Sequence, residues 1–168
     1  MKYHRMIATV GVIAFSSVFH APVQAQTREA DLEGFQEVPV ISTTGEGECR
    51  VNVNNDHTQI QAEISYSNLE GTVTQAHIHL GQTDVNGGIV VFFCSNLPSP
   101  PAGTPPCPAP PSTVERTFTA ADVRPVPDQG IASGEIAELI EALRENKAYC
   151  NVHSVRFPAG EIRGQLKK

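Results

Sequence analysis

The sequence predicts a mainly β protein with one packing helix, and two observations support this expectation. Apolar and polar residues alternate through the first half of the chain, as at Ile60, Ala62 and Ile64 with polar residues between them. A period of two places the apolar side chains on one face of a strand. One stretch, near residues 134–145, instead repeats its apolar residues with the period of a helix.

The strands are expected at intervals along the whole chain. They are predicted at residues 31–36, 46–54, 58–67, 74–80, 88–94, 114–119, 148–153 and 160–166. The turn-forming residues 54–57 separate two of these strands, which predicts an antiparallel hairpin. Residues 89–93 form a continuous apolar run, which indicates a strand in the centre of the sheet.

The helix is predicted from four apolar residues at i, i+3, i+4 and i+7. They are Ile136, Leu139, Ile140 and Leu143. Ser133 is a suitable N-cap, and Asn146 can close the C-terminus. We interpret this segment as a helix that covers part of the β structure.

The N-terminus has the layout of a secretory signal peptide. Lys2 and Arg5 precede an apolar run, residues 6–19, and small residues lead to a cleavage site after Ala25. The alternative is an uncleaved anchor, but the run is about 14 residues and a membrane-spanning helix needs roughly 20. We therefore expect residues 1–25 to be a signal peptide, residues 26–168 to be one domain, and the protein to be secreted or periplasmic.

The charge of the chain excludes two classes of partner. The formal net charge is −6, and removal of Lys2 and Arg5 without any acid makes it more negative by two. Such a protein is poorly suited to nucleic acid or to anionic membranes. No second apolar run approaches spanning length, so we expect no membrane span after signal cleavage.

All four cysteines follow the predicted signal peptide. An even number in an exported chain indicates disulfides, and four cysteines allow three pairings. A four-thiolate zinc site is the alternative, but the chain has no C-x-x-C pair.

Eight prolines between residues 95 and 112 predict an extended, exposed loop rather than a domain boundary. A Cys94–Cys107 disulfide would tie this loop down, and closing a loop of that size is worth about 3 kcal/mol in the chain-entropy model. Cys49–Cys150 then follows by elimination.

Two histidines on one strand are the sharpest local feature. His77 and His79 share a strand face because they are two residues apart. Two imidazoles and a third donor, for which His153 is the obvious candidate, can hold a copper or zinc ion. Two polar residues on an exposed strand face, without any function, are the alternative.

The C-terminal strand adds Glu161 and Arg163, which are two residues apart. A surface ion pair is the favoured interpretation of these two residues. Glu161 is also the candidate for a fourth metal ligand, or for a partner that orients one histidine ring. The chain has no G-x-S-x-G, P-loop or dinucleotide motif, so we expect no enzymatic activity of these kinds.

Taken in order, four blocks of the sequence resemble the CHRD (chordin-type) domain family. They are residues 32–39 (LEGFQEVP), 76–81 (AHIHLG), 86–91 (NGGIVV), and 149–153 (YCNVH) with 160–166 (GEIRGQL). The combination covers nearly all of the chain after residue 25, whereas the Pro-rich loop with Cys107 departs from the pattern as an insertion.

The resemblance implies an antiparallel, Greek-key-like β-sandwich with a helix inserted before the penultimate strand. It implies little about activity. A more distant similarity is to copper/zinc superoxide dismutase, another sandwich with an H-x-H strand. After residue 25, however, this chain has only four histidines, too few for a binuclear site of that type.

Three hypotheses follow, of which the third, a mononuclear redox enzyme, is the least favoured. The first is an exported binding domain that holds one copper or zinc ion through His77, His79 and His153. The second is a structural or protein-interaction module of the cell envelope or extracellular space, without metal and with an unknown protein partner.

Overall fold

The computed structural model describes residues 26–168, which form one eight-stranded antiparallel sheet and one α-helix. The order of the strands across the sheet is β5-β4-β7-β8-β1-β2-β3-β6. Their bounds are β1 Gln26–Glu33, β2 Glu46–Val53, β3 Ile60–Ser67, β4 Val73–Leu80, β5 Ile89–Ser95, β6 Ser112–Phe118, β7 Ala148–Ser154 and β8 Ile162–Gln165. The predicted signal peptide lies outside the described residues.

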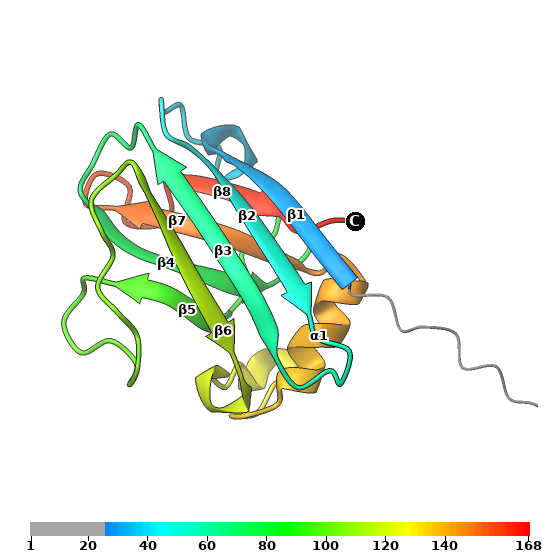
Figure 1. Cartoon of the computed structure of the whole chain (residues 1–168). Helices are drawn as coiled ribbons and strands as arrows, with labels where there is room; N and C mark the ends of the chain where they lie inside the picture. Colours follow the sequence, from blue (N-terminus) through cyan, green and yellow to red (C-terminus); the bar gives the residue numbers. More distant parts are fainter. Residues whose placement is uncertain (1–25) are drawn as a thin grey trace, which may run out of the picture.

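The sheet curls so that its two halves face each other across the core (Figure 1). Strands β1, β2, β3 and β6 form one half, and strands β8, β7, β4 and β5 form the other. Pairing between β1 and β8, at Glu33 and Arg163, makes the sheet continuous. The prediction of mainly antiparallel β structure is confirmed. The expected sandwich is not, because this single sheet nearly closes into a barrel.

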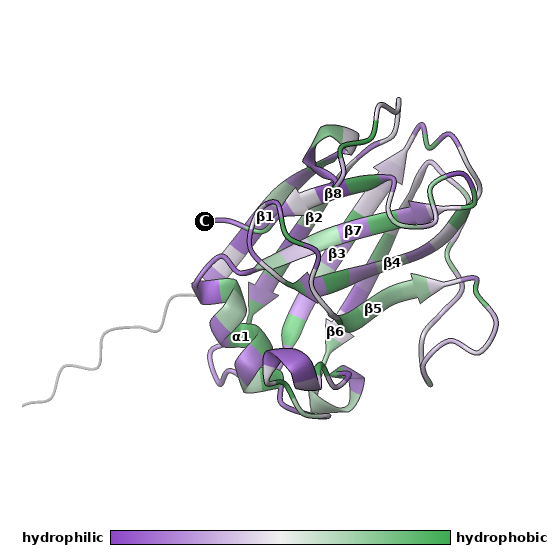
Figure 2. Cartoon of the chain, turned by 180° about the vertical axis from the view of Figure 1, so that it is seen from behind, coloured by the Kyte–Doolittle hydropathy of each residue, from purple (hydrophilic) through white to green (hydrophobic). Residues whose placement is uncertain are grey.

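The period-two pattern is confirmed by the hairpin of β2 and β3. Ile60, Ala62, Ile64 and Tyr66 are all buried, and the residues between them face outward. The two strands pair in register from Glu46 with Ser67 to Val53 with Ile60. Figure 2 shows the resulting alternation of hydrophilic and hydrophobic residues along the strands.

Two strand predictions need correction. β1 spans Gln26–Glu33 and is followed by a 3-10 turn at Gly34–Gln36, whereas the sequence predicted a strand over 31–36. β5 lies at an edge of the sheet and not in its centre. Val90, Val91 and Phe93 of its apolar run are nevertheless buried, and a loop covers the outer edge, where Arg124 N–H donates to the carbonyl of Val90.

The predicted helix is α1, Ile136–Arg144, and its four periodic apolar residues are buried. Glu135 occupies the N-cap position in place of Ser133, without a side-chain capping bond. Asn146 has φ 54°, the left-handed conformation that ends many helices. Arg28 of β1 donates from Nε to the carbonyl of Leu143 at 2.9 Å, which fastens the helix to the sheet.

Both predicted disulfides are present. Cys49–Cys150 joins β2 to β7 and so links the two halves of the sheet. Cys94–Cys107 holds the Pro-rich loop against the end of β5, where Asn96 also exchanges hydrogen bonds with the backbone of Cys107. Within residues 26–168, no helix has both the length and the apolar character needed to cross a membrane.

Candidate metal centre

Three histidines meet on the side of β4 and β7 that faces away from the core. His77 and His79 belong to β4, and His153 belongs to β7. The register pairs His77 with Asn151, and His79 with Tyr149. His153 lies two residues beyond Asn151, so the period of two puts it on the same face as Asn151 and therefore as His77. The predicted histidines are brought together by this register.

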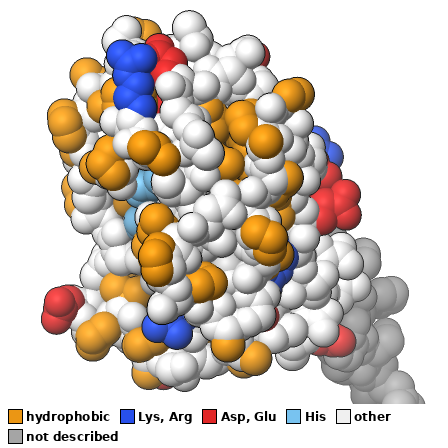
Figure 3. Space-filling view, turned by 90° about the vertical axis from the view of Figure 1, so that its left-hand side faces the viewer, with side chains coloured by type: hydrophobic (Ala, Val, Ile, Leu, Met, Phe, Trp, Pro, Cys, Tyr) orange, Lys and Arg blue, Asp and Glu red, His pale blue; other side chains and the backbone are white. Residues whose placement is uncertain are grey.

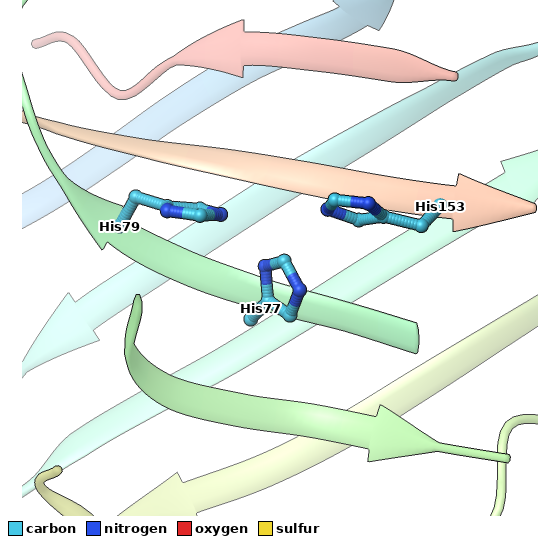
Figure 4. A group of neighbouring side chains, drawn as sticks. All are labelled: His77, His79 and His153. Carbon is cyan, nitrogen blue, oxygen red and sulfur yellow. The ribbon is translucent and has the colours of Figure 1, made fainter. Parts of the chain in front are cut away.

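The three rings converge (Figure 4). One nitrogen from each ring lies within 4.8 Å of a nitrogen from each of the others. The centre of an equilateral triangle with sides of that length lies about 2.8 Å from its corners, whereas a zinc–nitrogen bond measures about 2.0–2.1 Å. Small inward movements of the rings therefore bring all three nitrogens to bonding distance from a common ion.

The centre is buried rather than exposed, which overturns the interpretation of two unremarkable surface histidines. The exposed fractions are 0% for His77, 7% for His79 and 6% for His153. Figure 3 shows histidine side chains in a small recess that hydrophobic side chains surround.

Backbone carbonyls fix the orientation of two rings. Nδ1 of His79 lies 2.8 Å from the carbonyl oxygen of Gly87, and Nδ1 of His153 lies 3.0 Å from that of Pro158. A carbonyl oxygen only accepts, so each Nδ1 carries the proton and each Nε2 presents a lone pair. Carbonyl partners of this kind commonly orient metal-binding histidines.

The remaining ring nitrogens are buried without partners. Nε2 of His79, Nε2 of His153 and both nitrogens of His77 have no hydrogen-bond partner among the described residues. A buried polar atom left unsatisfied costs about 1–3 kcal/mol. Each ring therefore contributes at least one unsatisfied nitrogen to the centre, which is the arrangement that a metal ion would satisfy.

The three imidazoles are neutral at physiological pH. Burial lowers the pKa of His77 well below its usual 6.5, and the adjacent His79 and His153 lower it further. Burial lowers the pKa of His79 to about 4 and also lowers the pKa of His153. Because only a neutral imidazole binds a metal, no proton has to be displaced from these Nε2 atoms near pH 7.

Aromatic rings form the walls of the centre. Tyr149 stacks on His79, with ring centroids 4.5 Å apart and an angle of 4° between the planes. Phe92 packs edge-on against His77 at 5.2 Å. The hydroxyl of Tyr149 accepts a hydrogen bond from Gly87 N–H, which holds the loop whose carbonyl orients His79. These contacts limit the movement of the rings.

Glu161 and Arg163 are both buried, so the expected surface ion pair is wrong. Oε1 of Glu161 accepts hydrogen bonds from Thr43 Oγ1 and from the backbone N–H of Glu70. No acidic residue within 26–168 belongs to the group formed by the histidines, so Glu161 gains no support as a fourth ligand. Backbone carbonyls, not Glu161, orient the rings.

Arg163 instead braces the loop that follows β4. Its guanidinium lies 3.5 Å from the centroid of the Tyr149 ring and donates to the carbonyls of Gln82 and Val85. The same loop carries Gly87, whose carbonyl orients His79. Arg163 therefore supports the centre without reaching it.

Glu37 is a further residue of this region, and no pattern in the sequence singles it out. Its carboxylate accepts a hydrogen bond from Nδ2 of Asn151, the residue paired with His77. Burial raises the pKa of Glu37 to about 7, although Asn151 and Arg163 both act to lower it. A single sequence offers no periodicity that would single out Glu37, because it lies in an irregular loop.

The donor set could hold a metal ion. Neutral imidazoles suit zinc, copper, iron and nickel, and three protein ligands leave a fourth position for water or another ligand. Among the described residues, the three histidines are the group that could hold such an ion.

The comparison with family models agrees with the resemblance noted from the sequence. The family model of the CHRD domain matches residues 28–166, from the first strand to just beyond the last. Comparisons with curated proteins and with solved structures found no match. The family match covers almost all of the described residues, and the chain belongs to the CHRD domain family.

Proposed function

We propose that this protein is an exported binding domain that holds one copper or zinc ion through His77, His79 and His153. One observation carries the proposal: three buried rings converge, and each has a nitrogen without a hydrogen-bond partner in the described part of the chain. Buried polar groups of folded proteins are normally satisfied. An ion bound between the rings would satisfy all three nitrogens at once.

The export of the domain is supported by its cysteines. Two disulfides, Cys49–Cys150 and Cys94–Cys107, use all four cysteines of the chain. Disulfides persist in oxidising compartments and are rare in the cytosol. The N-terminal pattern of residues 1–25 agrees with such a location.

A metal titration tests the proposal. Residues 26–168 would be produced in an oxidising compartment without a His-tag and titrated with Zn²⁺ and with Cu²⁺, with affinity and stoichiometry measured by calorimetry or competition. We expect one ion per chain. His79→Ala should weaken binding by more than tenfold, since even changes to residues behind the ligands cost roughly 10–100-fold.

The matched control is His57→Ala. His57 lies in the β2–β3 turn and contacts Arg144 through Nε2, away from the centre. Its loss should leave the affinity unchanged. Equal affinities for wild type and His79→Ala, or no binding by the wild type, would reject the metal proposal.

That result would leave the second candidate, a protein-interaction module without metal. Exposed apolar side chains favour it: Phe35 is 70% exposed, Val40 is 64% exposed and Val85 is 42% exposed. The two loops that carry them are joined by a hydrogen bond from Asn86 Nδ2 to the carbonyl of Val38.

A further inference from the structure

Glu37 is hydrogen-bonded to Asn151 of β7, the strand that carries His153. It comes from the loop between β1 and β2 and is 6% exposed. Asn151 of β7 donates to its Oε1, and Gly160 packs against its carboxylate so closely that a Cβ there would lie 2.5 Å from the same oxygen. Gly160 also has φ +133°, which L side chains rarely adopt.

Asn151 connects this carboxylate to the centre. Asn151 is the β7 partner of His77, and it lies between Tyr149 and His153 on the same strand face. Its Nδ2 also donates to the carbonyl of Ile162, so the amide is held from two sides. Glu37 is thus one hydrogen bond away from the residue that adjoins His77.

The charge of the region explains why a carboxylate would be needed. Three neutral imidazoles bring no negative charge to a bound cation. The buried guanidinium of Arg163, which is 2% exposed, acts electrostatically on both Glu37 and His79. A divalent ion would add two further positive charges in a region from which water is largely excluded. Buried charge of one sign is unfavourable unless a charge of the other sign is close.

Glu161, the other buried acid, is held elsewhere by Thr43 and by the backbone of Glu70. We propose that Glu37 balances the charge of the bound ion and so makes the three-histidine centre favour divalent over monovalent cations. This inference rests on the proposed metal function and assigns the selectivity of that site. Glu37 is a selectivity residue and not a ligand, because it bonds to Asn151, the β7 partner of His77, and to none of the histidines.

The relation between charge and affinity makes the inference testable. Coulomb energy is proportional to the charge of the ion. Removing the carboxylate charge should therefore change the logarithm of the affinity twice as much for a divalent ion as for a monovalent ion. A variant that merely deforms the site should weaken both ions by the same factor.

The experiment compares wild type with Glu37→Gln, which keeps the shape and the acceptor oxygen but has no charge. Affinities for Zn²⁺, and for Cu⁺ without oxygen, would be measured by competition at about pH 8, where Glu37 is largely ionised. If Zn²⁺ binding falls about 30-fold, within the range for residues behind the ligands, Cu⁺ binding should fall only about fivefold. Glu48→Gln, an exposed acid of β2, is the charge-matched control and should change neither affinity by more than about twofold.

Each outcome decides a different question. A wild type that binds neither ion rejects the proposed function itself. If the wild type binds the ions, three results would overturn the role of Glu37 alone. They are equal losses of affinity for both ions in Glu37→Gln, no loss of affinity in Glu37→Gln, and the same losses in Glu48→Gln. Unfolding curves of the metal-free variants establish that the compared proteins are folded.

Discussion

The two halves of the sheet have similar strands but differ in the burial of their outer faces. In β3, buried residues alternate with outward-facing ones, so one face packs on the core and the other meets water. In β7 and β8 every residue is buried, and β4 is largely buried as well. The half made of β8, β7, β4 and β5 therefore buries the polar side chains of its outer face. The outer face of the half made of β1, β2, β3 and β6 is exposed to water.

Loops produce this difference. The loop after β1, the loop after β4 and the β7–β8 loop contribute Glu37, Gly87 and Pro158, respectively, each in contact with the outer face of β4 or β7. Covering a face rich in histidine, asparagine and arginine lowers stability unless each polar group finds a partner. Within residues 26–168, unpaired buried polar atoms remain on the three histidines, on Glu161 and on Gln165. Those of the histidines converge on one point, which is why we place the function in this half.

The largest expected effect concerns the disulfide between the halves. Cys49–Cys150 closes a loop of 101 residues, and Cys94–Cys107 closes one of 13. The chain-entropy model gives about 5 kcal/mol for the longer loop and about 3 kcal/mol for the shorter one. Denaturant unfolding of Cys49→Ala/Cys150→Ala should show the greater loss of stability, and Cys94→Ala/Cys107→Ala the smaller. The reverse order would show that the halves are held together by other contacts.

The second effect is the response of the histidine half to acid. The folded pKa of His79, about 4, lies below its unfolded value of about 6.5, so the unfolded chain takes up the proton first. The stability that the neutral His79 side chain contributes is complete above pH 6.5 and is lost as the pH falls toward 4. The loss amounts to about 3 kcal/mol for the metal-free protein. Stability curves of wild type and His79→Phe from neutral to acid pH should differ by this amount.

Glu37 acts in the opposite direction and supplies the control. Its folded pKa of about 7 lies above the usual value of 4.5, so its protonation favours the folded state as the pH falls between these values. Glu37→Gln should therefore lose more stability in acid than wild type does. Parallel curves for wild type, His79→Phe and Glu37→Gln would contradict the burial of both groups.

The third effect separates function from stability. His77→Leu removes two buried nitrogens that have no partner in residues 26–168, so the metal-free protein should become more stable by about 1–3 kcal/mol. The same substitution should abolish the stabilisation that added Zn²⁺ gives. Thermal unfolding with and without Zn²⁺ measures both changes.

Asn151→Leu is the comparison, since Asn151 is equally buried but donates to Glu37 and to Ile162. Removing a satisfied amide leaves these acceptors unpaired and should destabilise the protein. If His77→Leu destabilises it as well, the histidine is a structural residue.

Much of this architecture is predictable from local patterns. The period of two predicts β2 and β3, and the period of the apolar residues predicts α1, because each pattern reports one buried face. His77 and His79 are found for the same reason. The place of His153 beside this strand is suggested by its residue type and by the resemblance to the CHRD family, and the β4–β7 register establishes it.

The errors arise where burial does not come from the sheet. The apolar run of β5 indicated a central strand, but β5 lies at an edge that a loop covers. The sequence predicts a surface ion pair for Glu161 and Arg163, since such pairs are common. Their burial depends on the loops that pack over β8 and on partners such as Glu70 and Gln82, which lie far away in the sequence. The burial of Glu37 likewise depends on residues that lie far away in the sequence.

The smallest effect is expected for an ion pair on the half of the sheet whose outer face is exposed to water. Arg50 and Glu29 form an ion pair across β1 and β2 at 3.0 Å, with side chains 61% and 57% exposed. Exposed pairs of this kind contribute about 0–1 kcal/mol because water and salt screen them. Glu29→Gln should therefore change the free energy of unfolding by less than about 1 kcal/mol, and less still at high salt. Zn²⁺ affinity should stay at the wild-type value, because this pair lies on the half without the centre. A loss of metal binding in Glu29→Gln comparable to that in Glu37→Gln would mean that overall charge, and not a local carboxylate, controls the site.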